Sequence, residues 1–233
     1  MTPELFGIEH ILYIIISTLI LGGGLVFAFV FVKNDKIRNV ILKCIAFLLF
    51  VSIMGNRLSQ VFRYEEVRWY CIIPDSFCGM TSLVLSLAVL FGKKDNAVLH
   101  FVWLLGLFGG ISTVVYATFV GQGPTIFYLP TITGLLHHSF SATLVIALLM
   151  FKQINITYKK WYYTLFGFTC YLTVGAFLMH TFNLSDAFHI AEPLISDTPL
   201  TAWVMAPMYA AGYAIILFIV EIFKKKNVKL KTS

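Results

Sequence analysis

The stretch Pro74-Asp75-Ser76-Phe77-Cys78-Gly79-Met80-Thr81-Ser82 places polar side chains inside one of several long apolar runs. Those runs decide the fold, because 59% of the 233 residues are hydrophobic and only 12% are charged. An α-helix needs about 20 apolar residues to cross a bilayer, and several runs reach that length. Backbone groups in lipid must be bonded within their own segment, and the ten-residue alternation of a barrel is missing. The sequence therefore predicts an all-α, polytopic transmembrane helical bundle.

Seven spans are predicted, at about 11–32, 41–62, 71–91, 97–120, 130–151, 161–183 and 203–223. They leave no room for a separate soluble domain, so residues 1–233 are expected to form a single transmembrane helical domain. Lysines and arginines gather in alternate loops and in the tail after the last span. By the positive-inside rule the N-terminus is predicted outside and the C-terminus in the cytoplasm.

Net charge and cysteine content point away from other classes of protein. The net charge of +6 is explained by this alternation of loop charges, so no nucleic-acid partner is expected. The four cysteines have no paired spacing, which argues against both a disulfide framework and a zinc site. We therefore predict no metal and no cofactor.

Polar residues at membrane depth gather in one predicted outer layer. Cys78 lies about seven residues inside the third span, roughly 10 Å below the outer surface at 1.5 Å per residue. His137 and His138 lie at nearly the same depth in the fifth span. The other members of the layer are Asn56, Arg57, Asp75, Glu9, His10 and His180. Ionisable groups at this depth usually face a bundle interior or a water-filled cavity, so the layer predicts an outward-facing cavity.

Cys78 is the candidate nucleophile of this layer. Asp75, Cys78 and Ser82 share one helical face through i, i+3 and i+7 spacing, and this face is too polar to point at lipid. A buried thiol needs a base within hydrogen-bond reach, and His137 or His138 is the best available partner. Adjacent helical residues point about 100° apart, so only one of the two histidines is expected to face Cys78. The simpler interpretations are a cysteine acting as a small hydrophobe and histidines that only bond neighbouring helices.

Two other features are expected to serve packing and closure. Gly22-Gly23-Gly24 and the stretch from Gly106 to Gly110 are small-residue surfaces of the kind that let helices approach closely. The loop 184–202 is too long and too apolar for a plain connector. It is expected to fold back as a lid over the polar layer.

The order of short motifs resembles the YwaF family of bacterial integral membrane proteins, which is similar to eukaryotic multi-span membrane lipid acyltransferases and androgen-induced fatty-acid-ester hydrolases. The motifs cover most of the chain and are Ile8-Glu9-His10, Asn56-Arg57, Ile73-Pro74 through Cys78 to Ser82, Gly106 to Gly110, His137-His138, and Trp203 with Tyr209 in the last span. The resemblance implies a lipid acyl hydrolase or acyltransferase, with Cys78 at the nucleophile position and His138 or His137 at the histidine position. It also implies the cytoplasmic membrane of a bacterium.

The expected activity is therefore acyl transfer from a membrane lipid at the outer leaflet through a Cys-His pair. Asp75 or Asn56 would orient the base, and Arg57 would hold a phosphate or a developing oxyanion.

The runner-up hypotheses are a small-molecule or ion transporter that uses the same cavity, and a non-enzymatic lipid-binding protein. Few polar residues lie in the inner halves of the spans, which disfavours transport. A third alternative is a metal site built from ionisable side chains of the outer layer, which are Glu9, His10, Asp75, His137, His138 and His180. No two of them have a metal-binding motif spacing, which disfavours that site.

Overall fold

The structure is a computed structural model that describes residues 6–63, 66–117, 123 and 125–232; beyond Phe223 it describes the backbone only. The described residues form helices and no strands. The helices are α1 (Ile8–Ser17), the π-helical turn η1 (Thr18–Gly22), α2 (Gly23–Phe31), α3 (Asp35–Val61), the 3-10 turn η2 (Trp69–Ile72), α4 (Phe77–Leu90), α5 (Ala97–Val115), α6 (Leu129–Met150), the 3-10 turn η4 (Tyr158–Lys160), α7 (Tyr162–Phe182) and α8 (Ala202–Thr232). The all-α prediction is confirmed.

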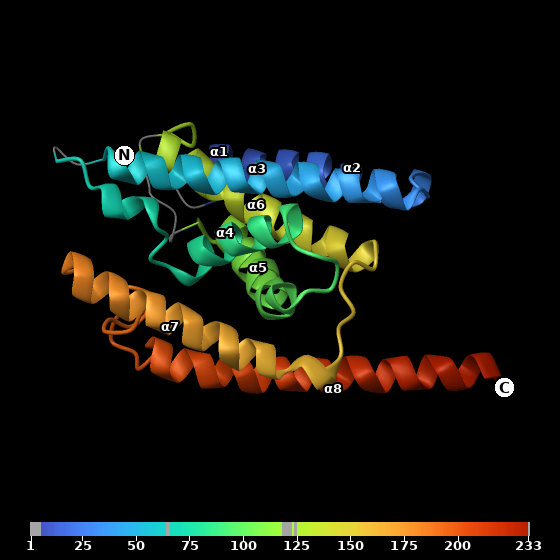
Figure 1. Cartoon of the computed structure of the whole chain (residues 1–233). Coiled ribbons are helices and arrows are strands. Elements are labelled where there is room, and N and C mark those ends of the chain that lie inside the picture. The colour runs from blue at the N-terminus through green and yellow to red at the C-terminus, as the bar shows by residue number, and fades with distance from the viewer. Residues whose placement is uncertain (1–5, 64–65, 118–122, 124, 233) are drawn as a thin grey trace.

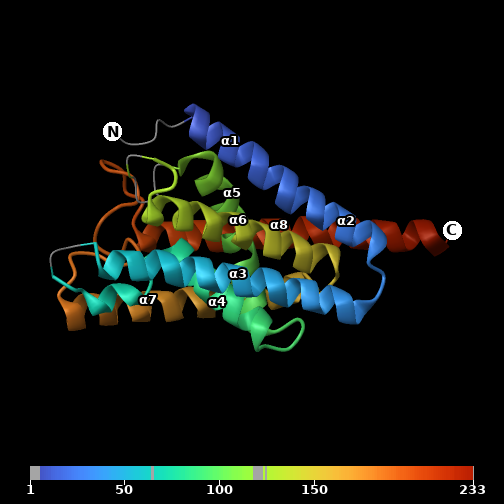
Figure 2. The ribbon, with the colours of Figure 1, turned by 90° about the horizontal axis from the view of Figure 1, so that it is seen from above.

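Helix α6 lies at the centre of an inner group formed by α3, α4, α5 and α6 (Figures 1 and 2). Its most apolar 18-residue stretch is 67% buried, against 11% for the rod that α1, η1 and α2 form together. The rod lies against the inner group on one side of the molecule, and the α7–α8 pair lies on the other (Figure 1). Most of the rod therefore presents apolar side chains outward, as a lipid-facing helix does.

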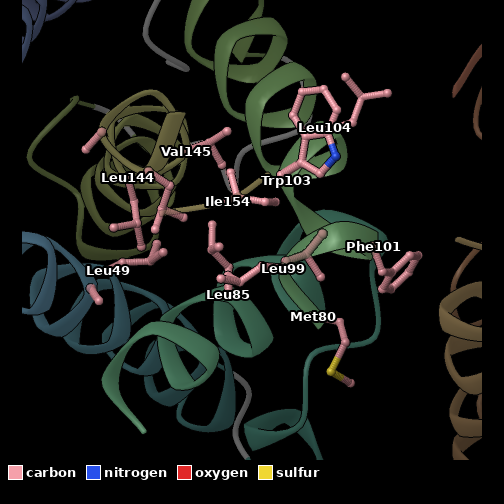
Figure 3. Packing of buried hydrophobic residues seen from close by; sticks show 14 of the residues in the cluster. Leu49, Met80, Leu85, Leu99, Phe101, Trp103, Leu104, Leu144, Val145 and Ile154 are labelled. Atoms are coloured by element: carbon pink, nitrogen blue, oxygen red, sulfur yellow. The ribbon is translucent and has the colours of Figure 1, made fainter. Parts of the chain in front are cut away.

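The core of the inner group consists of interlocking aliphatic side chains. Leu49, Leu85, Leu144 and Val145 come from the three helices α3, α4 and α6, and each is fully buried (Figure 3). On the α7–α8 side the core becomes aromatic, where the Trp103 Nε1–H donates to the Tyr213 hydroxyl at 3.0 Å, and that hydroxyl donates to the carbonyl of His100 at 2.7 Å. These bonds satisfy polar groups that would be costly to bury alone.

Six helical segments are long and apolar enough to cross a membrane: Ile8–Phe31, Asp35–Val61, Ala97–Val115, Leu129–Met150, Tyr158–Phe182 and Ala202–Phe223. The chain is thus built as a multi-pass membrane protein. The end of the predicted fourth span, residues 118–120, lies outside the described residues.

The predicted third span, 71–91, is represented by a shorter helix. Helix α4 has 14 residues and a length of about 21 Å at 1.5 Å per residue. Pro74 lies before the helix and not in its first turn, because the chain turns through η2 and an extended segment first. Ser76 then caps α4, its hydroxyl accepting from the Gly79 N–H at 3.2 Å. Cys78 is therefore the second residue of a helix, whereas the prediction placed it two turns inside one.

The two expected small-residue surfaces behave differently. Gly110 lies so close to α6 that an added Cβ would stand 2.7 Å from the carbonyl oxygen of His138, so close packing is confirmed there. Gly23 and Gly24 have no neighbour within 4 Å of such a Cβ. The glycine run of the first span therefore makes no close helix contact within the described chain.

Candidate functional site

A cavity of about 560 Å³ lies where α3, α4, α5, α6, α7 and α8 converge with the loop after α7. Its polar lining includes Cys78, His137 and His138, together with the ion pair of Arg57 and Asp75. The remaining wall is largely apolar and includes Ile53, Leu105, Phe168, Leu194 and Met205. The cavity thus offers a polar group of side chains beside an apolar space, as an amphipathic ligand requires.

Cys78 lies in the first turn of α4 and packs against α5. A Cβ built on Gly109 would stand 3.0 Å from the Cys78 Sγ, so only a glycine at this position leaves the sulfur its present place. The unpaired N–H groups at a helix N-terminus carry a partial positive charge. The start of α4 therefore favours negative charge on this sulfur, while burial disfavours it.

The two histidines of α6 lie together, their ring centroids 4.1 Å apart, and both line the cavity. The Nδ1 of His137 forms a hydrogen bond with the Ser82 hydroxyl at 3.1 Å. The ring of His138 hydrogen-bonds the backbone of Gly109, the residue against which the Cys78 sulfur lies. Both rings are more than nine-tenths buried. Both histidines therefore border the same cavity, and His137 also bonds Ser82 of α4.

Arg57 bonds three residues of the segment that leads into α4. Its Nε donates to the carbonyl of Cys71 at 2.8 Å and its Nη2 to the carbonyl of Ile73 at 3.3 Å. Its Nη1 lies 3.1 Å from the Asp75 carboxylate. All three guanidinium nitrogens are therefore occupied by the protein itself. The geometry gives Arg57 a structural task, which is to hold the turn before Cys78 in place.

Cys71 stands in the electrostatic field of this ion pair, outside the long helices. Partial burial raises the pKa of the Cys71 thiol, and the nearby Asp75 carboxylate adds to that effect. The guanidinium groups of Arg57 and Arg68 act in the opposite direction without cancelling it. A raised pKa keeps Cys71 in its thiol form near neutral pH, so it is a poor nucleophile.

Asn56 joins α3 to the start of α6. Its Nδ2 donates to the carbonyl of Pro130 at 3.0 Å and to the Thr133 hydroxyl at 3.3 Å. The Thr133 hydroxyl in turn donates to the carbonyl of Leu129. Asn56 lines the cavity, but both of these hydrogen bonds hold α3 to α6.

The loop after α7 closes one side of the cavity. The N–H of Phe188 donates to the carbonyl of Asp75 at 2.7 Å, and the buried Phe188 ring packs edge-on against Phe77. His189 and Leu194 then line the cavity. The expectation that this loop folds back over the polar layer is confirmed. Asp186 fixes the turn, because its carboxylate accepts from backbone N–H groups of the loop, including that of His189 at 3.1 Å.

Several cavity residues are not singled out by the sequence. These include Thr113 and His189. His189 belongs to a loop whose unusual length is visible in the sequence. Nothing in the spacing of Thr113 separates it from an ordinary packing residue.

Three residues predicted for the outer layer lie elsewhere. The buried His10 accepts from the Phe6 N–H at Nδ1 and donates from Nε2 to the carbonyl of Val114 at 2.9 Å. The Glu9 carboxylate accepts from the Ile126 N–H at 2.8 Å. Both residues thus tie α1 to chain segments near the ends of α5 and α6. His180 is exposed on α7 and does not line the cavity.

Metal ligands do not converge in the part of the chain that the structure describes, where no three His, Cys, Asp or Glu side chains form a group suited to an ion. The ionisable side chains weighed for such a site are spread between the cavity, the α1 contacts and the surface of α7.

A second polar cluster lies at the opposite ends of α4 and α5, where Asp95 joins two loops. Its carboxylate accepts from the Lys160 ammonium at 2.5 Å, from the His100 ring at 2.7 Å and from the Asn155 N–H at 2.8 Å. Partial burial acts to raise the pKa of Asp95, but these hydrogen bonds outweigh it and the pKa lies below its usual range. The cluster is a clamp between the α4–α5 and α6–α7 connections.

Comparison of the chain with known protein families, with characterised proteins and with solved structures gave no match. The arrangement of side chains around the cavity therefore carries the functional argument.

Proposed function

We propose that the protein is a membrane-embedded lipid acyl hydrolase or acyltransferase in which Cys78 is the nucleophile and His138 the general base. One observation carries this proposal: Cys78, His137 and His138 line the same cavity, and the rest of its wall is largely apolar. A nucleophile and a base beside a space suited to an acyl chain are what acyl transfer from a lipid requires.

The reaction proceeds by two acyl transfers. His138 takes the proton of the Cys78 thiol while the sulfur forms a bond to the ester carbonyl carbon. The tetrahedral intermediate collapses as the ester C–O bond breaks, and His138 returns the proton to the departing alcohol. Water or an acceptor alcohol then attacks the acyl-thioester, gives its proton to His138, and releases the product and the Cys78 thiol.

His138 is preferred over His137 as the base because of their partners. His138 and the Cys78 sulfur both lie against Gly109, whereas the Nδ1 of His137 is occupied by Ser82. His137 stacks on His138 and, held by Ser82, restricts the orientation of the neighbouring ring. The partial positive charge at the start of α4 stabilises the charge that develops on the sulfur.

The proposed substrate is a membrane lipid in the outer leaflet. This follows from the proposed topology, with α4 as a seventh, short membrane segment, the N-terminus outside and the C-terminus in the cytoplasm. The resemblance to the YwaF family agrees with this activity and with a place in the bacterial cytoplasmic membrane. Asp75 and Asn56 contribute by holding the polar end of the cavity together.

The test is to follow acyl release from phospholipid by the purified protein and its Cys78→Ala variant, with Cys170→Ala as the matched control on the exposed face of α7. Loss of turnover only in Cys78→Ala, with an acyl group detected on Cys78 of the unmodified protein, supports the proposal. Equal turnover in all three proteins removes Cys78 as nucleophile. Lipid binding without turnover points to the non-enzymatic alternative, and solute flux in proteoliposomes to the transporter.

A further inference from the structure

The outer end of α5 places three residues beside the proposed reacting groups. Gly109 touches the Cys78 sulfur, and Gly110 packs against the backbone of His138. Thr113 follows one turn after Gly109, at a rise of about 6 Å, and also lines the cavity. The same helix that brings sulfur and imidazole together therefore presents a hydroxyl one turn above them.

The Thr113 hydroxyl does not make the hydrogen bond that is commonest for a helical threonine. Threonine in a helix commonly donates to the carbonyl four residues earlier. Four threonines do so here, at positions Thr133, Thr143, Thr169 and Thr173. Thr113 is 4% exposed, yet its hydroxyl makes no hydrogen bond with a described residue. The carbonyl that it would use, that of Gly109, accepts from Ser112 at 3.5 Å instead.

A buried hydroxyl without a protein partner needs another explanation. Three polar atoms of the described residues, His100 Nδ1, Thr164 Oγ1 and Tyr209 Oη, are fully buried and have no hydrogen-bond partner. Tyr209 also borders the cavity, but its oxygen is fully buried, whereas the Thr113 oxygen is not among these fully buried atoms. Its free donor therefore faces the space that a ligand would occupy.

Arg57 and Asn56, two other polar side chains of the cavity, already bond the protein. The three nitrogens of Arg57 hold backbone carbonyls and Asp75, and the Nδ2 of Asn56 holds Pro130 and Thr133. Acyl transfer places a negative charge on the former carbonyl oxygen, and a positioned donor for that oxygen is a large part of catalysis. The expectation that Arg57 serves this oxyanion relies on a guanidinium that already uses three of its five N–H donors, one on each nitrogen, to bond the protein, whereas the Thr113 O–H is uncommitted.

We propose that Thr113 is the oxyanion donor of this site, its hydroxyl donating a hydrogen bond to the substrate carbonyl oxygen as the Cys78 sulfur attacks. This inference rests on the proposed function. The hydroxyl keeps its proton throughout, and no bond to Thr113 is made or broken.

The test compares Thr113→Val, which keeps the shape and removes the hydroxyl, with Thr113→Ser, which keeps the hydroxyl. Thr173→Val is the matched control, because Thr173 is exposed on α7 and bonds only its own helix. Each purified protein is assayed with a phosphatidylcholine that carries a fluorescent acyl chain. We expect kcat to fall about 10²-fold in Thr113→Val with KM nearly unchanged, to be largely kept in Thr113→Ser, and to be unaffected in Thr173→Val.

Two failures are distinguishable. If the unmodified protein turns over lipid in a Cys78-dependent manner and Thr113→Val keeps its kcat, or raises KM alone, the oxyanion role is overturned while the proposed function stands. If the unmodified protein shows no Cys78-dependent turnover, the proposed function and this inference are overturned together. Thermal unfolding of Thr113→Val identifies a folding defect, and Thr113→Ser then decides the role, since loss of kcat in a folded serine variant contradicts it.

Discussion

The sulfur of Cys78 lies against Gly109, 3.0 Å from the position that a Cβ of that residue would take. This distance is tighter than ordinary van der Waals contact, so any larger residue at position 109 must move the sulfur. Gly109 therefore fixes where the proposed nucleophile lies, although it takes no part in the chemistry.

Gly109→Ala should leave the fold intact and displace the thiol. The Cys78 side chain ends at its sulfur and rotates about one bond, so it can yield without moving the backbone. A misplacement of about 1 Å costs up to about 10²-fold in rate, and we expect acyl turnover to fall by 10-fold or more. The measurement is kcat, beside the rate at which Cys78 reacts with a maleimide.

The matched control is Gly24→Ala on α2, where an added Cβ meets nothing within 4 Å. Alanine should be neutral or slightly stabilising there, since glycine is the poorer helix former by about 0.5–1 kcal/mol. Equal turnover in Gly109→Ala and Gly24→Ala would show that the sulfur position does not limit the reaction.

Ser82→Ala should lower turnover without destabilising the protein much. The Ser82 hydroxyl bonds the Nδ1 of His137, and the centroid of the His137 ring lies 4.1 Å from that of the His138 ring. Removing the hydroxyl lets both rings reorient, and we expect a loss of about 10-fold in kcat, a fraction of what general acid–base catalysis supplies. The control is Ser86→Ala, one turn along α4, whose hydroxyl donates to the Leu83 carbonyl away from the cavity. An equal effect of the two serines would count against the positioning role.

Arg57→Lys should destabilise the turn before α4 despite keeping the charge. Lysine has a single ammonium and cannot reproduce a fork that reaches the carbonyls of Cys71 and Ile73 together with Asp75. We expect a loss of about 1–2 kcal/mol, seen as a fall of a few degrees in the Tm of the purified protein. Arg63→Lys is the control, because Arg63 is exposed and its side chain makes one long bond to Gln60. Identical Tm values for the two variants would contradict the role given to Arg57.

Asp95→Asn should weaken the clamp between the two loops, and the effect should depend on pH. The pKa of Asp95 lies below its usual range in the folded protein, because the bonds from Lys160, Asn155 and His100 outweigh partial burial. A carboxyl with a depressed folded pKa contributes stability above its unfolded pKa of about 3.9 and loses it as the pH falls through the folded value. The Tm difference between the unmodified protein and Asp95→Asn should therefore be constant near neutral pH and shrink below about pH 4.

The control for this prediction is Asp35→Asn, since Asp35 forms a 3.5 Å ion pair with Arg38 and its side chain is 86% exposed. Surface pairs of this kind contribute about 0–1 kcal/mol, so its Tm should change little. A Tm difference for Asp95→Asn that persists unchanged into acid would show that the carboxylate charge is not what stabilises the loops.

The helical class and most of the predicted spans follow directly from hydropathy, because length and apolar content decide whether a helix can cross a bilayer. The start of α4 does not follow from hydropathy. Two residues mark this start: Pro74, which lacks an N–H for a helix interior, and Ser76, whose side chain caps a helix. Hydropathy averaged over a whole apolar run does not show either mark. Cys78 accordingly changes from an interior residue of a span to the first turn of a short helix.

Depth along a span was a good guide to which residues share a layer and a poor guide to which share a cavity. Cys78, His137 and His138 do line one cavity, whereas His10 and Glu9 bond backbone groups near the ends of α5 and α6. The rotation of each helix about its axis decides whether a side chain points into the cavity or toward another segment. That rotation depends on contacts between segments that are distant in the sequence. The role proposed for Thr113 is invisible in the sequence for the same reason, since only the packed structure shows that this residue lines the cavity.

The bond from the Phe188 N–H to the Asp75 carbonyl has a consequence for biosynthesis. Ribosomes deliver the chain from its N-terminus, so α3 to α6 are available for insertion before the loop after α7 has been made. During that interval the side of the cavity that His189 and Leu194 later form is missing. The nascent protein thus holds Cys78 beside an incomplete wall until α7, the loop after it and α8 have been made, so the cavity can close only after that part of the chain has left the ribosome.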